Sequence, residues 1–151
     1  MAELRKDPIL GDWVIVAPDR AARPFDHAEN GQGAPPDVCP FCKGNEAATP
    51  GAVLTIPSDD SPDDWAVRVV PNRYPAVDSS AMQIPLSEFF EQTSAVGYHE
   101  VIVESPSHDL AIRDLSTTQI GRVLRAWRDR LAAISVDAHI AHTMIFKNEG
   151  A

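Results

Sequence analysis

Cysteine is scarce in this sequence, because its 151 residues include only two, Cys39 and Cys42, separated by two residues. Two cysteines so close together do not make the disulfide framework of a small secreted domain. Long apolar runs are also absent, since no stretch reaches the roughly 18 residues that a transmembrane helix needs. Residues 1–7 are not followed by the apolar core of a secretory signal. We therefore expect a cytoplasmic protein.

Positive charge is under-represented, with 13 Lys and Arg against 22 Asp and Glu and a formal net charge of −9. Proteins that bind a nucleic-acid backbone usually carry the opposite sign, so general nucleic-acid binding is disfavoured. An anionic ligand would have to be held by local arginines and backbone amides. The sequence also lacks an internal repeat, a glycine-rich phosphate loop and a recognisable acyl-transfer triad.

The pattern of β-branched and aromatic residues, together with the turn residues between them, predicts a chain in which strands outnumber helices. Residues 76–96 have no clear period and are predicted to be loop. The predicted strands are residues 13–17, 53–56, 65–70, 97–104 and 143–147.

One helix is predicted to begin near Ser116, because Ser116 and Gln119 have the spacing of a capping box. Arginines along this helix are predicted to form a solvated face. The fold class is predicted to be α+β, mainly an antiparallel sheet with one long helix. The apolar residues that recur at helical spacing are Ile120, Val123, Leu124, Trp127 and Leu131, and the arginines are Arg122, Arg125, Arg128 and Arg130.

The Cys39-Pro40-Phe41-Cys42 turn is the clearest chemical motif. Two residues between the cysteines allow both thiolates to approach one tetrahedral Zn²⁺. A thioredoxin-like redox pair would need a strand before the turn and a helix after it, and the flanking Pro and Gly residues oppose both. Two unliganded structural cysteines are the remaining interpretation. Metal binding is the one we favour, and it requires further ligands.

Five histidines are available as ligands: His27, His99, His108, His139 and His142. His108 follows a predicted strand on a tight turn and is the best third ligand by position. His99 lies within that strand and is expected to be packed or half-buried. The chain offers no evident fourth ligand. Separately, Arg20 and Arg23 follow a predicted strand and form either a phosphate clamp or a solvated charged turn.

Seven segments, taken in order, resemble the galactose-1-phosphate uridylyltransferase family of the histidine-triad superfamily. Each segment is weak alone, but their shared order is specific. They are Arg5-Lys6-Asp7-Pro8; Gly11-Asp12-Trp13-Val14-Ile15-Val16-Ala17-Pro18 with Arg20 and Arg23; Cys39-Pro40-Phe41-Cys42; Val70-Pro71-Asn72-Arg73-Tyr74-Pro75-Ala76; Gly97-Tyr98-His99-Glu100-Val101; Ser105-Pro106-Ser107-His108; and Phe146-Lys147-Asn148-Glu149-Gly150.

The resemblance implies a histidine-triad-like, zinc-stabilised fold and an enzyme of galactose metabolism that exchanges UMP between UDP-glucose and hexose-1-phosphate through a uridylyl-histidine. It implies a homodimer, in which the arginine loop reaches the neighbouring subunit's site. Adenylyl-transferring relatives that act on ADP-glucose share similar motifs, so the choice of nucleotide stays open. The implied zinc ligands are Cys39, Cys42 and His108, and the implied nucleotide contacts are Arg20, Arg23, Asn72, Arg73 and Asn148.

The departure from the family concerns its catalytic segment, His-Pro-His-x-Gln, which supplies the nucleophile and the fourth zinc ligand. No His-Pro-His occurs in these 151 residues, and His139-Ile140-Ala141-His142 does not replace it. We expect residues 1–151 to be the N-terminal domain of such an enzyme, cut before that motif as a truncation, an incomplete gene model or one product of a split gene. It would pair with a C-terminal half and be inactive alone. A non-catalytic zinc-stabilised binding module is the alternative.

Overall fold

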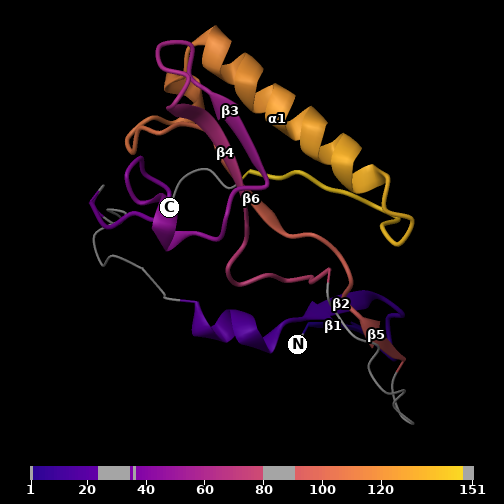
Figure 1. The fold of residues 1–151 in the computed structure, drawn as a ribbon. Helices are drawn as coiled ribbons and strands as arrows, with labels where there is room; N and C mark the ends of the chain where they lie inside the picture. Colours follow the sequence, from indigo (N-terminus) through magenta and orange to yellow (C-terminus); the bar gives the residue numbers. More distant parts are fainter. Residues whose placement is uncertain (1, 24–34, 36, 80–90, 148–151) are drawn as a thin grey trace. The chain divides into compact units, whose positions relative to one another are not determined.

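The structure, a computed structural model, describes residues 2–23, 35, 37–79 and 91–147. These residues form two compact units. The first unit comprises Met1–Pro24 with Asn72–His99, and the second comprises Phe25–Pro71 with Glu100–Ala151. Each unit contains a three-stranded antiparallel sheet, and one long helix belongs to the second unit (Figure 1). The predicted α+β class is confirmed, with two small sheets where a single sheet was expected.

The sheet of the first unit has the order β2-β1-β5, formed by β1 (Glu3–Lys6), β2 (Trp13–Val16) and β5 (Gln92–Ser94). A tight turn joins β1 to β2. In this turn the Asp7 carboxylate accepts hydrogen bonds from the Ile9 and Leu10 N–H groups at 2.7 and 2.9 Å.

The prediction for residues 13–17 is confirmed by β2. The loop prediction for residues 76–96 is wrong at β5, and β1 was not predicted at all. Both strands are short and mostly polar, so they exist because β1 pairs with β2 on one side and with β5 on the other. Residues 80–90 lie outside the described part of the chain.

The sheet of the second unit has the order β3-β4-β6, formed by β3 (Leu54–Pro57), β4 (Trp65–Pro71) and β6 (Glu100–Val103). The predicted strands at residues 53–56 and 65–70 are confirmed within about one residue. The strand predicted at residues 97–104 is shorter than expected. Every residue from 65 to 70 is buried, because β4 is central in its sheet and covered on both faces.

The long helix α1 (Thr117–Ser135) lies along β3 and β4 (Figure 1). Its predicted start is confirmed, since the Ser116 hydroxyl accepts a hydrogen bond from the Gln119 N–H at 3.2 Å. The Gln119 side chain does not complete a capping box. Its amide donates instead to the carbonyls of Ala66 and Glu104, at 2.8 and 2.7 Å, and thereby fixes the first turn of α1 to the sheet.

The buried face of α1 is rotated from the predicted one. Leu124 and Leu131 are 52% and 37% exposed, whereas Ala126 and Ile134 are buried. The small Ala126 side chain lets the helix backbone approach the sheet, a role that hydrophobicity alone does not reveal. The core cluster consists of Ile56, Val67, Val69, Leu115, Val123 and Ala126, with Ile120 and Trp127 partly buried against it.

The prediction that the helix arginines form one solvated face is also wrong in part. Arg130 is only 18% exposed and makes two hydrogen bonds of 2.8 and 2.7 Å to the Glu100 carboxylate on β6. Arg122 pairs with Asp59.

The strand predicted at residues 143–147 is not formed, since these residues are irregular. Its β-branched and aromatic composition fits a strand, but a strand also needs a paired neighbour, and none of the described strands pairs with it. None of the described helices is long and apolar enough to cross a membrane.

Candidate metal site and candidate ligand loop

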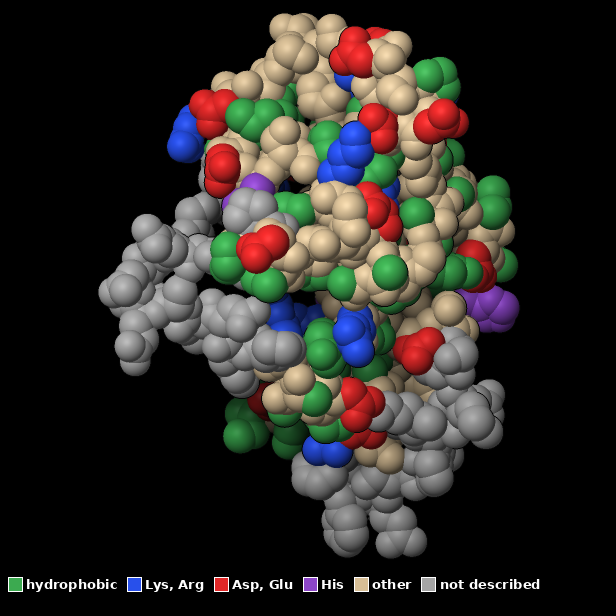
Figure 2. Space-filling view, turned by 60° about the vertical axis from the view of Figure 1, so that its left-hand side comes forward, with side chains coloured by type: hydrophobic (Ala, Val, Ile, Leu, Met, Phe, Trp, Pro, Cys, Tyr) green, Lys and Arg blue, Asp and Glu red, His purple; other side chains and the backbone are tan. Residues whose placement is uncertain are grey.

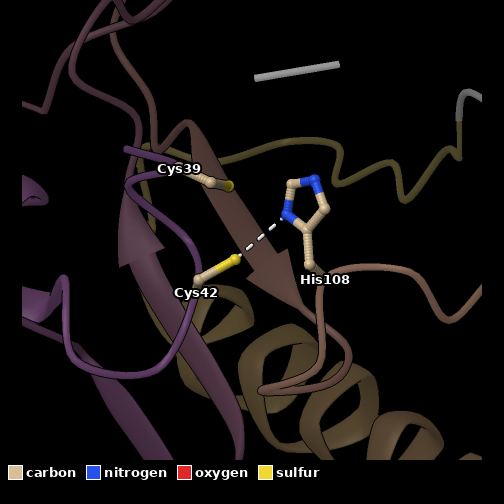
Figure 3. Close-up of side chains that lie close together, drawn as sticks. All are labelled: Cys39, Cys42 and His108. Atoms are coloured by element: carbon tan, nitrogen blue, oxygen red, sulfur yellow. Dashed lines mark hydrogen bonds between the residues drawn. The ribbon is translucent and has the colours of Figure 1, made fainter. Parts of the chain in front are cut away.

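Cys39, Cys42 and His108 converge in the second unit (Figure 3). One ligand atom from each residue lies within 4.8 Å of the other two. The Cys42 Sγ atom is 3.1 Å from the His108 Nδ1 atom. The sequence-based grouping of these three side chains is therefore matched by their positions in space.

The cysteine turn and the histidine loop reach each other through backbone contacts. The Cys42 N–H donates to the Cys39 carbonyl at 3.2 Å, which closes the turn, and the Lys43 N–H contacts the Pro106 carbonyl of the loop after β6 at 3.5 Å. Gly44 has a φ of +95°, a left-handed conformation that glycine adopts without strain. These contacts bring residues 39–42 and His108 together although 66 positions separate Cys42 from His108.

Three further side chains support this turn and were not predicted from the sequence. Asn45 Nδ2 donates to the Cys39 carbonyl at 2.8 Å. The Glu46 carboxylate accepts from the Gly44 N–H and, at 2.7 Å, from Trp65 Nε1 on β4. The Trp65 bond, followed by the backbone bonds, holds the pKa of Glu46 below its usual value. No periodic pattern marks these residues, because their roles depend on contacts between separate segments.

The three donors fit a tetrahedral soft-metal site. In such a site, bond lengths to sulfur and nitrogen place neighbouring ligand atoms about 3.3–3.8 Å apart. The Cys42 Sγ–His108 Nδ1 distance of 3.1 Å is close to that range, and all three donors lie within 4.8 Å of one another. Burial, followed by the adjacent Cys39 thiol, raises the pKa of Cys42. Without a cation, Cys42 therefore favours its protonated thiol form. The residues present therefore suit zinc chemistry.

The redox alternative is not supported by the local structure. A turn precedes Cys42, and the segment after it is the short 3₁₀ helix η2 (Glu46–Ala48), so the described residues on either side of the cysteines, 35 and 37–53, include neither the strand nor the α-helix of a thioredoxin-like unit. Both cysteines are free thiols. Of the other candidate histidines, His139 and His142 are exposed and outside the group, and His27 lies outside the described residues.

A second polar cluster lies in the first unit around residues 72–76, here called the ligand loop. Arg20 is not in a loop but in the 3₁₀ helix η1 (Pro18–Ala22), and its guanidinium donates to the Tyr74 carbonyl at 2.8 Å. Asn72 Oδ1 accepts from the Tyr74 N–H at 2.8 Å. The loop is thus held by one predicted arginine and by its own first residue.

His99 completes the cluster. Its Nδ1 atom accepts from the Ala76 N–H at 2.9 Å, and its Nε2 atom lies 3.2 Å from Asn72 Nδ2. Burial, followed by the positive charge of Arg20, lowers the pKa of His99. The prediction of a half-buried His99 is confirmed, but its contacts with the ligand loop were missed.

The remaining predicted contacts are less constrained. Arg23 caps η1, where its N–H donates to the Arg20 carbonyl at 3.1 Å, and both Arg23 and Arg73 are exposed. Asn148 lies outside the described residues. Figure 2 shows Lys and Arg side chains interspersed with Asp and Glu over the face that it views, so charge on that face is mixed in sign.

Comparison with known proteins gives a consistent result. A family model described as galactose-1-phosphate uridyl transferase, N-terminal domain, matches residues 1–151. The chain is 35% identical over 156 residues to ADP-glucose phosphorylase of Arabidopsis thaliana, covering 99% of this chain and 44% of that protein. It is 26% identical over 152 residues to galactose-1-phosphate uridylyltransferase of Thermotoga maritima, covering 99% and 42%.

A solved structure of a uridylyltransferase mutant has a TM-score of 0.63 to this chain at 28% identity, covering 93% of this chain and 37% of that one. The chain therefore spans less than half the length of the proteins that it matches.

Proposed function

This chain belongs to the galactose-1-phosphate uridyl transferase family, and its residues 1–151 match the N-terminal domain of that family. We propose that it is the zinc- and nucleotide-binding domain of a hexose-1-phosphate nucleotidyltransferase. The observation that carries the proposal is the family match over the whole chain. The proposal includes a histidine-triad-like fold, a homodimer or a pairing with a C-terminal half, and a cytoplasmic location.

Cys39, Cys42 and His108 would hold a structural zinc ion. When bound, zinc would join the cysteine turn to the loop after β6 and neutralise the repulsion between the two thiolates. The support for this assignment is the 3.1 Å approach of the Cys42 sulfur to the His108 ring and the convergence of all three donors.

The nucleotide contacts are assigned to Arg20, Arg23, Asn72, Arg73 and Asn148. A guanidinium fork binds phosphate oxygens through charge-assisted hydrogen bonds, and the Asn72 amide of the ligand loop offers further donors. The bond between Arg20 and the Tyr74 carbonyl supports a shared role for η1 and the ligand loop. The sequence has no His-Pro-His, so we assign the covalent step of the reaction to no residue among these 151.

Two nucleotides are candidates. UDP-glucose with galactose-1-phosphate is the main proposal, which rests on the family. ADP-glucose with phosphate is the second, which rests on the 35% identity to a protein named ADP-glucose phosphorylase. Both reactions need the same contacts to a diphosphate.

Calorimetric titration of the zinc-loaded chain with UDP-glucose and with ADP-glucose tests the proposal and chooses between the two. Saturable binding of either ligand is expected, and the tighter one identifies the nucleotide. Activity is then measured with the matching acceptor, first with this chain and then after addition of the C-terminal half of a relative. We expect turnover only in the second case. Binding of neither nucleotide sugar would refute the assignment.

A further inference from the structure

His99 makes one hydrogen bond that determines its protonation. A backbone N–H can only donate, so the Ala76 N–H requires a bare lone pair on His99 Nδ1, 2.9 Å away. A neutral imidazole carries a single proton, which must then be on Nε2. Protonation of Nδ1 would make the His99 N–H and the Ala76 N–H point toward each other, with no acceptor in the contact. Burial, followed by the positive charge of Arg20, also lowers the pKa of His99 and so disfavours the doubly protonated ring.

The Nε2–H group of this ring meets another donor. Asn72 Nδ2 is 3.2 Å from His99 Nε2, and an amide NH₂ group also only donates. Turning the amide over would not resolve the conflict, because Asn72 Oδ1 already accepts the Tyr74 N–H at 2.8 Å. Two side-chain donors from different segments of the first unit therefore converge without an acceptor between them.

We propose that His99 is a ligand-binding residue, whose Nε2–H forms, together with Asn72 Nδ2, a donor pair for one anionic oxygen of a bound phosphate group. A phosphate oxygen accepts several hydrogen bonds and would satisfy both donors at once. The guanidinium of Arg20, held against the Tyr74 carbonyl, adds positive charge near His99. The inference deepens the proposed function, on which it rests for the identity of the phosphate compound.

The same ring has a second role in this arrangement. Through Nδ1 it fixes the Ala76 end of the ligand loop, and through Nε2 it faces the Asn72 end. One side chain thus spans the loop, so a change of the ring alters both loop geometry and the donor pair. A useful experiment has to separate these two effects.

The first measurement is nitrogen NMR of the ¹⁵N-histidine-labelled chain at pH 7.5, which reports the tautomer of each ring. We expect His99 to be neutral with its proton on Nε2, and its Nε2 resonance to shift when inorganic pyrophosphate is added. A proton on Nδ1, or a resonance that pyrophosphate leaves unchanged, would overturn the proposal without any substitution.

The second measurement compares two substitutions by titration with pyrophosphate. His99→Asn keeps an acceptor near the Nδ1 position but loses the Nε2 donor, and should weaken binding by about tenfold. His99→Gln keeps a donor near the Nε2 position but loses the loop bond, and should retain more of the affinity. His142→Gln, at an exposed histidine of the second unit, is the control and should bind as the unaltered chain does.

Equal pyrophosphate affinity of the His99→Asn variant and the unaltered chain would overturn the donor role. The outcomes also separate this inference from the proposed function. Nucleotide-sugar binding that is insensitive to His99→Asn would refute the inference alone. Pyrophosphate binding that depends on His99, in a chain that binds neither UDP-glucose nor ADP-glucose, would refute the proposed function and leave the inference standing.

Discussion

The two units of this protein are stabilised in different ways. The second unit buries a core of aliphatic side chains between α1 and the β3-β4-β6 sheet. In the first unit the described buried residues are small, namely Ala2, Ala95 and Gly97, and the side chains of Trp13, Val14 and Ile15 on β2 are about half exposed. Apolar burial is the dominant stabilising term in folding, so the first unit depends more on backbone pairing and polar contacts.

This difference matches the chemistry that each unit carries. The candidate metal site belongs to the unit with the large core, where an additional cross-link strengthens an already packed region. The ligand loop belongs to the unit with the small core, where its shape depends on Arg20, Asn72 and His99. Loops with little buried apolar surface adjust more readily to a ligand. The following predictions test this contrast, from the largest expected effect to the smallest.

Loss of a metal ligand should have the largest effect. Cys42→Ser should remove stoichiometric zinc and lower the free energy of unfolding by on the order of 5 kcal/mol, since metal binding contributes directly to folding. For a chain of this size that corresponds to a fall of roughly 10–20 °C in melting temperature. Metal analysis and calorimetry check the result. A chelator should lower the melting temperature of the unaltered chain but not that of the variant. Equal chelator sensitivity of both would contradict the metal assignment.

The ion pair between α1 and β6 should rank second. Arg130→Met leaves the Glu100 carboxylate, 12% exposed, without its bidentate partner and should cost about 2–3 kcal/mol. Arg128→Met is the matched control, because the Arg128 side chain is 74% exposed and its ion pair is with the adjacent Asp129, so its loss should cost less than about 0.5 kcal/mol. Urea denaturation measures both. Similar losses of unfolding free energy for the two variants would show that burial of the Arg130–Glu100 pair does not add to its contribution to stability.

The third prediction moves to the first unit. Arg23→Ala should weaken nucleotide binding by about 1.5–3 kcal/mol through loss of a charge-assisted hydrogen bond, with little change in melting temperature, because Arg23 is exposed. Titration calorimetry gives the affinity and a thermal scan gives the stability. Unchanged affinity would return Arg23 to the role of a solvated turn residue. A large loss of stability would contradict the view that this arginine serves a ligand.

The smallest effect should be the pH dependence contributed by His99. Its pKa is lowered from the ordinary value of 6.5, so the folded chain favours the neutral ring. The stability that this provides is fully present above about pH 6.5 and is lost as the pH falls through the folded-state pKa, because the unfolded chain then binds the proton more readily. The stability difference between the unaltered chain and His99→Asn should therefore narrow from pH 7.5 to pH 5.5. A stability difference that widens as the pH falls would contradict a neutral His99 ring in the folded chain.

Several features could be predicted from the sequence because they depend on neighbours along the chain. The two-residue spacing of Cys39 and Cys42, the Ser116 cap and the apolar runs at residues 65–70 and 13–17 all indicate local structure directly. The position of His108 after a strand was also enough to nominate it as the third metal ligand. The order of the motifs along the chain indicated the family, because seven motifs that are weak individually are specific when they occur together in one order.

Other features were decided by tertiary contacts. The β1 and β5 strands exist because they pair with each other, whereas residues 143–147 have strand composition but no paired strand among those described. Ala126 is buried and Leu124 is exposed because the sheet fixes the rotation of α1. The donors of Asn72 and His99 meet because β4 and β6 are neighbours, so the chain after one strand lies beside the chain before the other. Such placements depend on pairing and packing between distant segments, which local sequence patterns do not encode.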